Sequence, residues 1–320
     1  MTPEDAAVAS ADAVSNLTSR FMLDAATYIH GGSLGFEGMS FYTSGRGAVL
    51  GDVDAEAVTQ AFVFFHPENV KANWDGGAGV MERAQAALEF MNCCSKWGED
   101  HLPDDLDARR LGDLAHKVAA NADGYDAPVF EGWRHLTPPN TPKAAAVFHM
   151  NALRELRFAL HGRAVLAQGI EPQDAVAHRQ PHMYAMFGWG DPIDSSAEIA
   201  ADWNKAEDDT NAGMAKALSV LTSAELDEFV ALYNPEARGK RAATWSETAP
   251  EGRWRTYSYD EIVARDKCSL DLFWLKDDSL MDADSLPDPD VIAQEIADDL
   301  RAALVQIEEI LGDLPKGAGA

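Results

Sequence analysis

Apolar residues recur at steps of three and four through most of residues 13–233, and alanine is abundant there. This period places apolar side chains along one face of an α-helix, and alanine has the highest helix propensity. Residues 131–142 interrupt the pattern, because Pro138, Pro139 and Pro142 lack the N–H that a helix needs. The sequence therefore predicts an all-α protein, with one helical subdomain at 13–130, a non-helical connector at 131–142 and a second subdomain at 143–233.

The two predicted subdomains share a short pattern, which predicts two related helical halves. The sequence GRGAVL at 45–50 precedes a helix start at Asp52 or Asp54, and GRAVL at 162–166 precedes one at Glu171. An internal duplication and a convergent helix-hairpin composition both stay open as its origin.

Thr222 and Glu225 have the spacing of a capping box, which starts a helix. Residues 195–233 therefore favour a helix-turn-helix-like hairpin, although any helical hairpin would give the same signals.

A long amphipathic helix is predicted near the C-terminus. Asp288 and Pro289 form a typical helix start, because aspartate caps a helix and proline fits its first position. Apolar residues then recur at steps of four, four, four, three and four, from Ile292 to Leu311. The resulting stripe must be buried. The pattern leaves two alternatives open, namely packing on the rest of this chain or on another protein.

The residues before this helix include uncommon side chains in a distinctive order. They read GRWR-x-YSYDE at 252–261, ARDK at 264–267, SLD-x-FWLKD at 269–277 and LPDPD at 286–290. In these motifs, residues 235–313 resemble the C-terminal tail of the modification (methylase) subunit of type I restriction–modification systems. The resemblance implies that residues 234–313 are a docking tail for a protein partner, either the specificity subunit of such a system or a second copy of this chain. The expected docking residues are Trp254, Tyr257, Phe273, Trp274, Ile292, Ile296, Leu300, Leu304, Ile307 and Leu311.

The resemblance does not extend to methyl transfer. In the modification subunits a separate Rossmann-like domain carries that activity, with a glycine-rich loop for S-adenosylmethionine and an Asn-Pro-Pro-aromatic motif that holds the flipped adenine. This chain has no Gly-x-Gly-x-x-Gly, and its single Pro-Pro pair, Pro138-Pro139, is not followed by an aromatic residue. Ser40 and Ser44 lack a nucleophile elbow. We therefore expect no catalytic residue and no cofactor, and the balance favours a protein that is not an enzyme.

The body of the chain resembles an actinobacterial family of helix-turn-helix proteins of the MarR-related type. The resemblance rests on scattered residues between about 20 and 233: Phe41-Tyr42, Gly45-Arg46, Leu50-Gly51, Ala61-Phe62, Phe65-His66-Pro67, Val70, Leu153-Arg154-Glu155, His161, Glu207, Thr210 and Leu221. It implies a regulatory or ligand-sensing protein. Only about 20 residues separate Phe187 from Asp208, so we expect the family's winged recognition segment to be shortened or lost, which weighs against DNA reading.

Two histidines stand in apolar surroundings, with arginines near them in the sequence. His66 follows four apolar residues, and His161 lies between Leu160 and Gly162. A pocket with aromatic walls, two histidines and an arginine suits a small anionic or planar ligand. The alternative is that each histidine is a hydrogen-bonded residue of the core or of a helix end. The candidate pocket residues are Arg46, Phe62, Phe65, His66, Arg154, Arg157 and His161.

The amino-acid composition limits which binding partners and which cellular compartment we expect for this protein. The chain has 53 acidic and 26 basic residues, a formal net charge of −27, which disfavours DNA because phosphate contacts need a surplus of Lys and Arg. No apolar run approaches the roughly 18 residues that span a bilayer. Cys93, Cys94 and Cys268 show no disulfide or zinc spacing. His178 and His182 have a metal-binding spacing, but Pro181 breaks the helix between them, so no metal site is expected. We expect a cytoplasmic protein with no membrane contact.

Three classes of function remain open at this stage. The first is a non-enzymatic regulator or ligand sensor of the MarR-like type whose tail docks a protein. The second is an accessory or anti-restriction component of a type I restriction–modification system, which would bind the specificity subunit without methyltransferase activity. An enzyme in the helical body that uses His66 and His161 is the third and the least supported.

Overall fold

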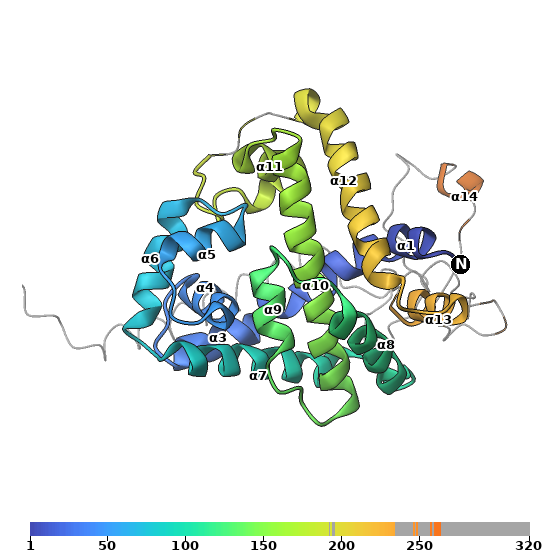
Figure 1. Cartoon of the computed structure of the whole chain (residues 1–320), viewed down its shortest axis with the longest axis horizontal. Helices are drawn as coiled ribbons and strands as arrows, with labels where there is room; N and C mark the ends of the chain where they lie inside the picture. Colours follow the sequence, from blue (N-terminus) through green and yellow to red (C-terminus); the bar gives the residue numbers. More distant parts are fainter. Residues whose placement is uncertain are drawn as a thin grey trace, which may run out of the picture. The chain divides into compact units, whose positions relative to one another are not determined.

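The computed structural model describes residues 1–191, 193, 196–233, 246, 248, 257 and 259–263. These residues form helices, turns and loops and no β-strand, which confirms the predicted all-α fold (Figure 1). Residues 1–239 and 240–320 form two separate units. None of the described helices is both long enough and apolar enough to cross a membrane.

The first unit contains the helices α1 (Pro3–Asn16), α2 (Ser19–Met22), α3 (Ala25–Ser33), α4 (Ser40–Gly47), η1 (Ala48–Leu50), α5 (Ala55–Phe62), α6 (Pro67–Ala78), α7 (Arg83–His101), α8 (Ala108–Asn121), α9 (Pro128–Arg134), α10 (Pro142–Ala167), α11 (Pro172–Arg179), η2 (Pro181–Met183), α12 (Ser196–Leu218) and α13 (Ser223–Tyr233). In the second unit the structure describes the short helix α14 (Tyr259–Val263) and a half-buried Tyr257. The other predicted docking residues, and the predicted C-terminal helix, lie outside the described residues.

Local sequence signals set several helix starts. Asp54 and Asp107 accept hydrogen bonds from the backbone N–H groups of Ala57 and Arg110, and so cap α5 and α8. The capping box predicted before α13 is confirmed. The N–H of Glu225 donates to Thr222 Oγ1 at 3.3 Å, and the N–H of Thr222 donates to Glu225 Oε2 at 2.8 Å.

The predicted connector at 131–142 is wrong in its first third, because α9 extends to Arg134. Pro128 stands at the first helical position, where its missing N–H costs nothing. Phe130 and Trp133 are buried, and Trp133 Nε1 donates to the Phe148 carbonyl at 2.9 Å. Tertiary packing therefore stabilises a helical turn at 131–134, before Pro138 and Pro139 are reached.

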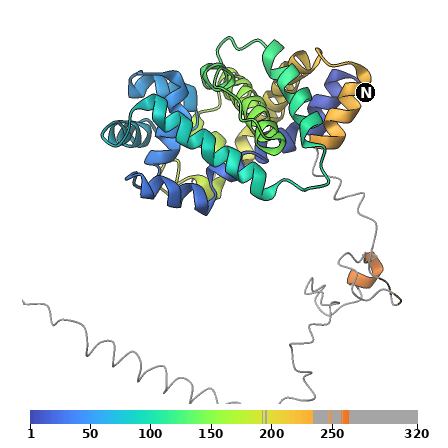
Figure 2. The ribbon, with the colours of Figure 1, turned by 90° about the horizontal axis from the view of Figure 1, so that it is seen from below.

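The 26-residue helix α10 is the central element of the first unit. It packs against α8, α12, α7, α9 and α1, as seen in Figures 1 and 2. Its middle turns are buried on nearly every side, from Val147 to Arg157. α7 and α8 belong to the first predicted subdomain and α10 to the second. The division into subdomains at 13–130 and 143–233 stays a prediction.

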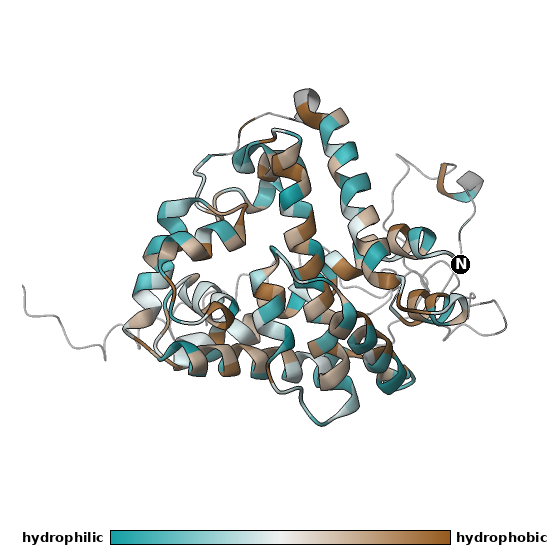
Figure 3. Cartoon of the chain, viewed as in Figure 1, coloured by the Kyte–Doolittle hydropathy of each residue, from teal (hydrophilic) through white to brown (hydrophobic). Residues whose placement is uncertain are grey.

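Buried apolar residues form two clusters in this unit. The larger one joins helices from α1 to α10 with η1, α12 and α13, and includes Tyr42, Phe65 and Leu153. The smaller one joins the end of α10 to α11 and α12, and includes Phe64 and Trp203. Figure 3 shows the helices that build them as mixtures of hydrophobic and hydrophilic residues, as expected for helices with one buried face.

Candidate functional site

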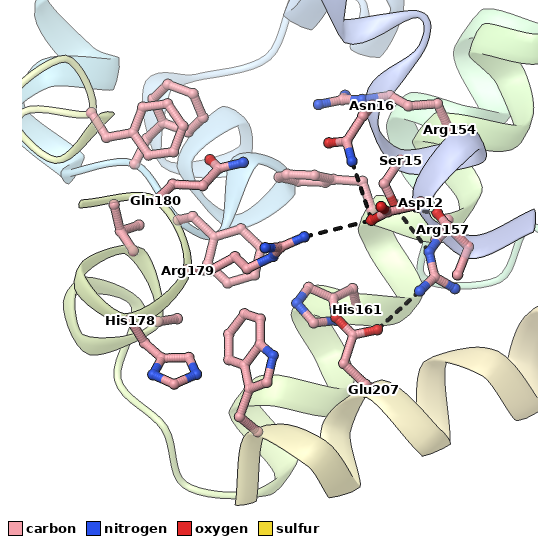
Figure 4. A pocket seen from close by; sticks show the side chains of 18 of the residues that line it. Asp12, Ser15, Asn16, Arg154, Arg157, His161, His178, Arg179, Gln180 and Glu207 are labelled. Carbon is pink, nitrogen blue, oxygen red and sulfur yellow. Dashed lines mark hydrogen bonds and ion pairs between the residues drawn. The ribbon is translucent and has the colours of Figure 1, made fainter. Parts of the chain in front are cut away.

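A cavity of about 500 Å³ lies among α1, α10, α11 and α12, where residues of both apolar clusters meet (Figure 4). Aromatic side chains form much of its wall, and charged groups enter from all four of these helices. Its lining consists of Ala11, Asp12, Ser15, Asn16, Tyr42, Phe64, Phe65, Arg154, Arg157, Phe158, His161, Ala175, Val176, His178, Arg179, Gln180, Phe187, Trp203 and Glu207.

One face of α10 supplies the centre of the site. Arg154, Arg157, Phe158 and His161 follow one another at steps of three, one and three, so their side chains leave the same side of the helix. Opposite them, Phe65 stacks on Phe187 with ring centroids 4.1 Å apart. The cavity thus has a charged side on α10 and a flat aromatic wall facing it.

Four of the seven predicted pocket residues, Phe65, Arg154, Arg157 and His161, line this cavity. The other three do not. Phe62 is fully buried beneath Arg46, and Arg46 itself lies behind the wall. His66 caps α6, because its Nδ1 accepts from the N–H of Glu68 at 3.2 Å.

Sequence reasoning missed the residues that α1, α11 and α12 bring to the cavity. Asp12, Ser15, Arg179 and Trp203 lie in ordinary helical stretches, and no motif connects them. Glu207 was among the residues of the family resemblance, and this was the one signal that pointed to α12.

A buried ion cluster stands at the α10 side of the cavity. Arg46 donates to both carboxylate oxygens of Glu155, from Nε at 3.0 Å and from NH2 at 2.8 Å. Arg154 donates to the same carboxylate at 2.7 Å. Phe158 lies below both guanidinium groups, with its ring centroid 4.4 Å from Arg46 Cζ and 5.0 Å from Arg154 Cζ. Two arginines therefore share one acid in a nearly dry environment.

The charges in this cluster do not balance. Glu155 and Arg46 are each 1% exposed, and Arg154 is 9% exposed. Burial acts to raise the pKa of Glu155, but the fields and hydrogen bonds of Arg154 and Arg46 outweigh it and hold the pKa below its usual value. The carboxylate is thus ionised, and two positive charges against one negative charge leave an excess of one positive charge beside the cavity.

Arg157 belongs to a separate network, in which each of its three nitrogens donates one hydrogen bond. Its Nε donates to Ser15 Oγ, its NH1 to Asn211 Oδ1 and its NH2 to Glu207 Oε2, each at 2.9 Å. Burial lowers the pKa of Arg157, against the opposing fields of Glu207 and Asp12. This arginine ties α1, α10 and α12 together, as the dashed lines in Figure 4 show in part.

His161 adjoins this network in one definite tautomer. The Thr210 hydroxyl donates its single proton to the Ala206 carbonyl at 2.6 Å, so it can only accept from His161 Nδ1, 3.2 Å away. Glu207 Oε1, a second acceptor, lies 3.7 Å from the same nitrogen. Burial lowers the pKa of His161, against the opposing field of Glu207. The neutral ring therefore carries its proton on Nδ1 and a lone pair on Nε2.

Two histidines flank the indole of Trp203 on the cavity wall. The ring centroid of His161 lies 4.9 Å from that of Trp203, and the centroid of His178 lies 5.1 Å from it. His178 Nδ1 is buried and has no hydrogen-bond partner in the structure as described. At the edge of the cavity, Arg179 and Asp12 form an exposed ion pair of 3.6 Å between α11 and α1.

A strained turn presents the aromatic wall. Val63 has φ 51° and ψ −61°, and the N–H of Phe64 donates to the carbonyl of Phe62 at 2.5 Å. This is a γ-turn of the rare hand, which is unfavourable for a β-branched residue. It directs Phe64 and Phe65 into the cavity. Such strain tends to persist at functional sites, where the surrounding structure maintains it.

The arrangement suits binding of a planar anion, with charge and aromatic surface side by side. Among the described residues no group of three or more His, Cys, Asp or Glu side chains could hold a metal ion. His178 ends α11 and His182 lies in η2, so the two do not share a helix face.

Comparison with known proteins gives the chain's relationship. Residues 7–246 match a helix-turn-helix family. The chain belongs to this helix-turn-helix family. This match covers the first unit from residue 7 onward, including every residue that lines the cavity.

The helix-turn-helix protein is also partly similar to type I restriction enzyme methylase subunits. It is 33% identical over 120 residues to the StySJI methylase subunit of Salmonella typhimurium, 34% over 120 residues to the StySPI methylase subunit of Salmonella potsdam and 32% over 115 residues to the EcoKI methylase subunit of Escherichia coli. These matches cover 29–31% of this chain and 22% of each relative, so the chain spans about a fifth of the relatives' length. No solved structure matches.

The helix-turn-helix-like hairpin was predicted at 195–233, where the structure has α12 and α13, and α13 packs against α1 and α8. Two acids of α13 bind bases of α8. Glu225 pairs with Lys117 at 2.8 Å, and Glu228 pairs with Arg110 at 2.7 Å. The hydrogen bond from Lys117, with those at Thr222, lowers the pKa of Glu225 to about 2. The polar side of α13 is therefore acidic and engaged within the unit.

Proposed function

We propose that this protein is a non-enzymatic, cytoplasmic regulator of the MarR-like type that senses a small planar anion and docks a protein partner through residues 234–313. One observation carries the proposal: Arg46 and Arg154 share the single carboxylate of Glu155 beside an aromatic cavity. An uncompensated buried charge costs on the order of several kcal/mol. An anion bound to Arg154 offsets that cost, because its negative charge balances the excess positive charge of the cluster.

Thermal unfolding of the full chain with a panel of planar carboxylates tests the sensing function. We expect a saturable rise in Tm, because a ligand that binds only the folded state stabilises it by about 2.7 kcal/mol at 100 times Kd. Arg154→Met abolishes the rise. Arg163→Met is the matched control, because Arg163 lies on the same helix but outside the lining and pairs with Asp126. A rise that persists in Arg154→Met, or no rise with any planar acid, contradicts the proposal.

The partial similarity to methylase subunits favours a second candidate function. In this alternative the chain is an accessory or anti-restriction component of a type I restriction–modification system, and its tail occupies the specificity subunit. Co-expression and co-purification of the full chain with such a subunit tests it. A complex that survives size-exclusion chromatography, and that needs Trp254 and Trp274, supports the alternative. Separate elution of the two proteins contradicts this alternative function.

The charge distribution argues against DNA as the main partner. The chain carries a net charge of −27, and the acids of α13 lie where a recognition helix would need bases. We expect no retention on duplex DNA at physiological salt. Retention with a steep salt dependence would contradict this and would restore DNA binding as the role of the hairpin.

A further inference from the structure

The free acceptor on His161 defines a second requirement on the ligand, beyond negative charge. Nδ1 of this ring donates to the Thr210 hydroxyl oxygen, and the Thr210 hydroxyl donates its own proton to the Ala206 carbonyl. His161 lines the cavity, and none of the hydrogen bonds found among the described residues ends at its Nε2. His161 lines a cavity that a small molecule can enter, and a hydrogen bond to Nε2 would add to the binding of a molecule that carries a donor. A bound molecule is the natural source of that donor.

The cationic end of the site is Arg154 and not Arg157. All three nitrogens of Arg157 already donate, to Ser15, Asn211 and Glu207. Arg154 donates from NH1 to a carboxylate that Arg46 also binds through two bonds. The excess positive charge therefore resides on the Arg46–Arg154 pair, and Arg154 is the member of that pair that lines the cavity.

The distance between these two ends sets the length of the ligand. Arg154 and His161 are seven residues apart on one helix, which corresponds to about 10 Å along the axis of α10. Phe158 lies between them on the same face, and the Phe65–Phe187 stack lies opposite. Two fused rings with an acid at one end match this span and fill the space between aromatic walls.

We propose that the ligand is a planar two-ring acid that also bears an N–H or O–H donor, with its acid group on Arg154 and its donor on Nε2 of His161. The inference rests on the proposed function and names the ligand class of that same cavity. His161 is then the residue that sets specificity, because it distinguishes acids of the same shape by the presence of a donor. A site built to receive a hydrogen bond rejects analogues that lack it.

Two isosteric probes test this with the full chain by isothermal titration calorimetry. Indole-3-carboxylate carries an N–H, and benzothiophene-3-carboxylate has sulfur in its place. The wild-type protein should bind the indole at least about tenfold more tightly, which corresponds to one buried hydrogen bond. In His161→Phe, which keeps an aromatic ring against Phe64 and Trp203, the ratio should fall to near one. His135→Phe, at an exposed histidine outside the cavity, should keep the ratio.

The outcomes separate this inference from the proposed function. Equal binding of both probes, lost in Arg154→Met, leaves the anion sensor standing and overturns the role of His161. Binding of neither probe at millimolar concentration, or binding that Arg154→Met does not weaken, overturns both. A measurement on the wild-type protein covers the case in which His161→Phe does not fold. The ¹⁵N spectrum of the imidazoles should show His161 protonated at Nδ1, with Nε2 shifting when the indole is added. A ring protonated at Nε2 overturns the inference.

Discussion

Glu155 pairs with two guanidinium groups at once, so the three residues of its cluster should respond very differently to substitution. Glu155→Gln leaves Arg46 and Arg154 buried without an acid, and the expected loss is about 3–5 kcal/mol of unfolding free energy. Arg154→Met leaves a one-to-one pair between Arg46 and Glu155, so the ligand-free protein should lose little or become more stable. Urea unfolding of both variants checks this. Equal losses of unfolding free energy in the two variants would show that the excess positive charge does not destabilise the ligand-free protein.

His149 should make the folded protein sensitive to mild acid. Burial, and then the neighbouring charge of His116, lower the pKa of His149 from 6.5 to about 4. The unfolded chain therefore binds more protons than the folded one between those values. The contribution of His149 is fully present above pH 6.5 and is lost as the pH falls towards 4. In His149→Gln the urea midpoint should fall less steeply from pH 7 to pH 4.5, with a residual slope from His161. An unchanged slope would contradict this assignment.

Close packing between α9 and η1 depends on a single glycine. A Cβ at Gly132 would stand 2.1 Å from the carbonyl oxygen of Val49, which is backbone and cannot turn aside. Gly132→Ala should therefore destabilise the protein by about 1–3 kcal/mol or more. Gly32→Ala is the matched control, because nothing lies within 4 Å of its added Cβ on α3 and alanine favours the helix. Its Tm should be unchanged or slightly higher. Similar losses in both variants would argue against the clash.

Helices were predictable to the extent that their signals are local. The apolar period and the Thr222–Glu225 capping box depend on neighbours within four residues, and both appear in the structure. α9 was missed because its stability comes from burial of Phe130 and Trp133 by other elements. The face of α10 that lines the cavity was accessible from sequence, since Arg154, Arg157 and His161 share a helical period. The contributions of α1, α11 and α12 were not, because they depend on how distant helices pack.

At the scale of the whole molecule, the proposed sensing and the proposed docking fall in separate units. Every residue that lines the cavity precedes residue 208, whereas the second unit begins at Lys240. Removal of residues 240–320 should therefore leave the ligand-induced rise in Tm intact and abolish capture of a protein partner. Differential scanning calorimetry of the full and shortened chains with the same acid checks the first half. Loss of the rise on truncation would mean that the tail completes the binding site.

The complete set of cavity-lining residues could not be predicted from the sequence, because the site is assembled from distant segments. Ser15 and Arg157 are 142 residues apart and share a hydrogen bond, and Arg157 and Glu207 are 50 residues apart. No local rule connects such pairs, because their contact exists only after α1 and α12 have packed on α10. The composition disfavoured DNA as a partner, but it could not locate a cavity.

The excess charge at Arg154 has a consequence for the fate of the protein in the cell. A sensor that is less stable when empty unfolds more often, and proteases act on the unfolded chain. If the protein senses an acid as proposed, each molecule that binds its acid would be protected, and each empty one would be cleared sooner. The abundance of the protein would then follow the supply of the compound without any change in the expression of its gene, so that turnover itself would report the signal.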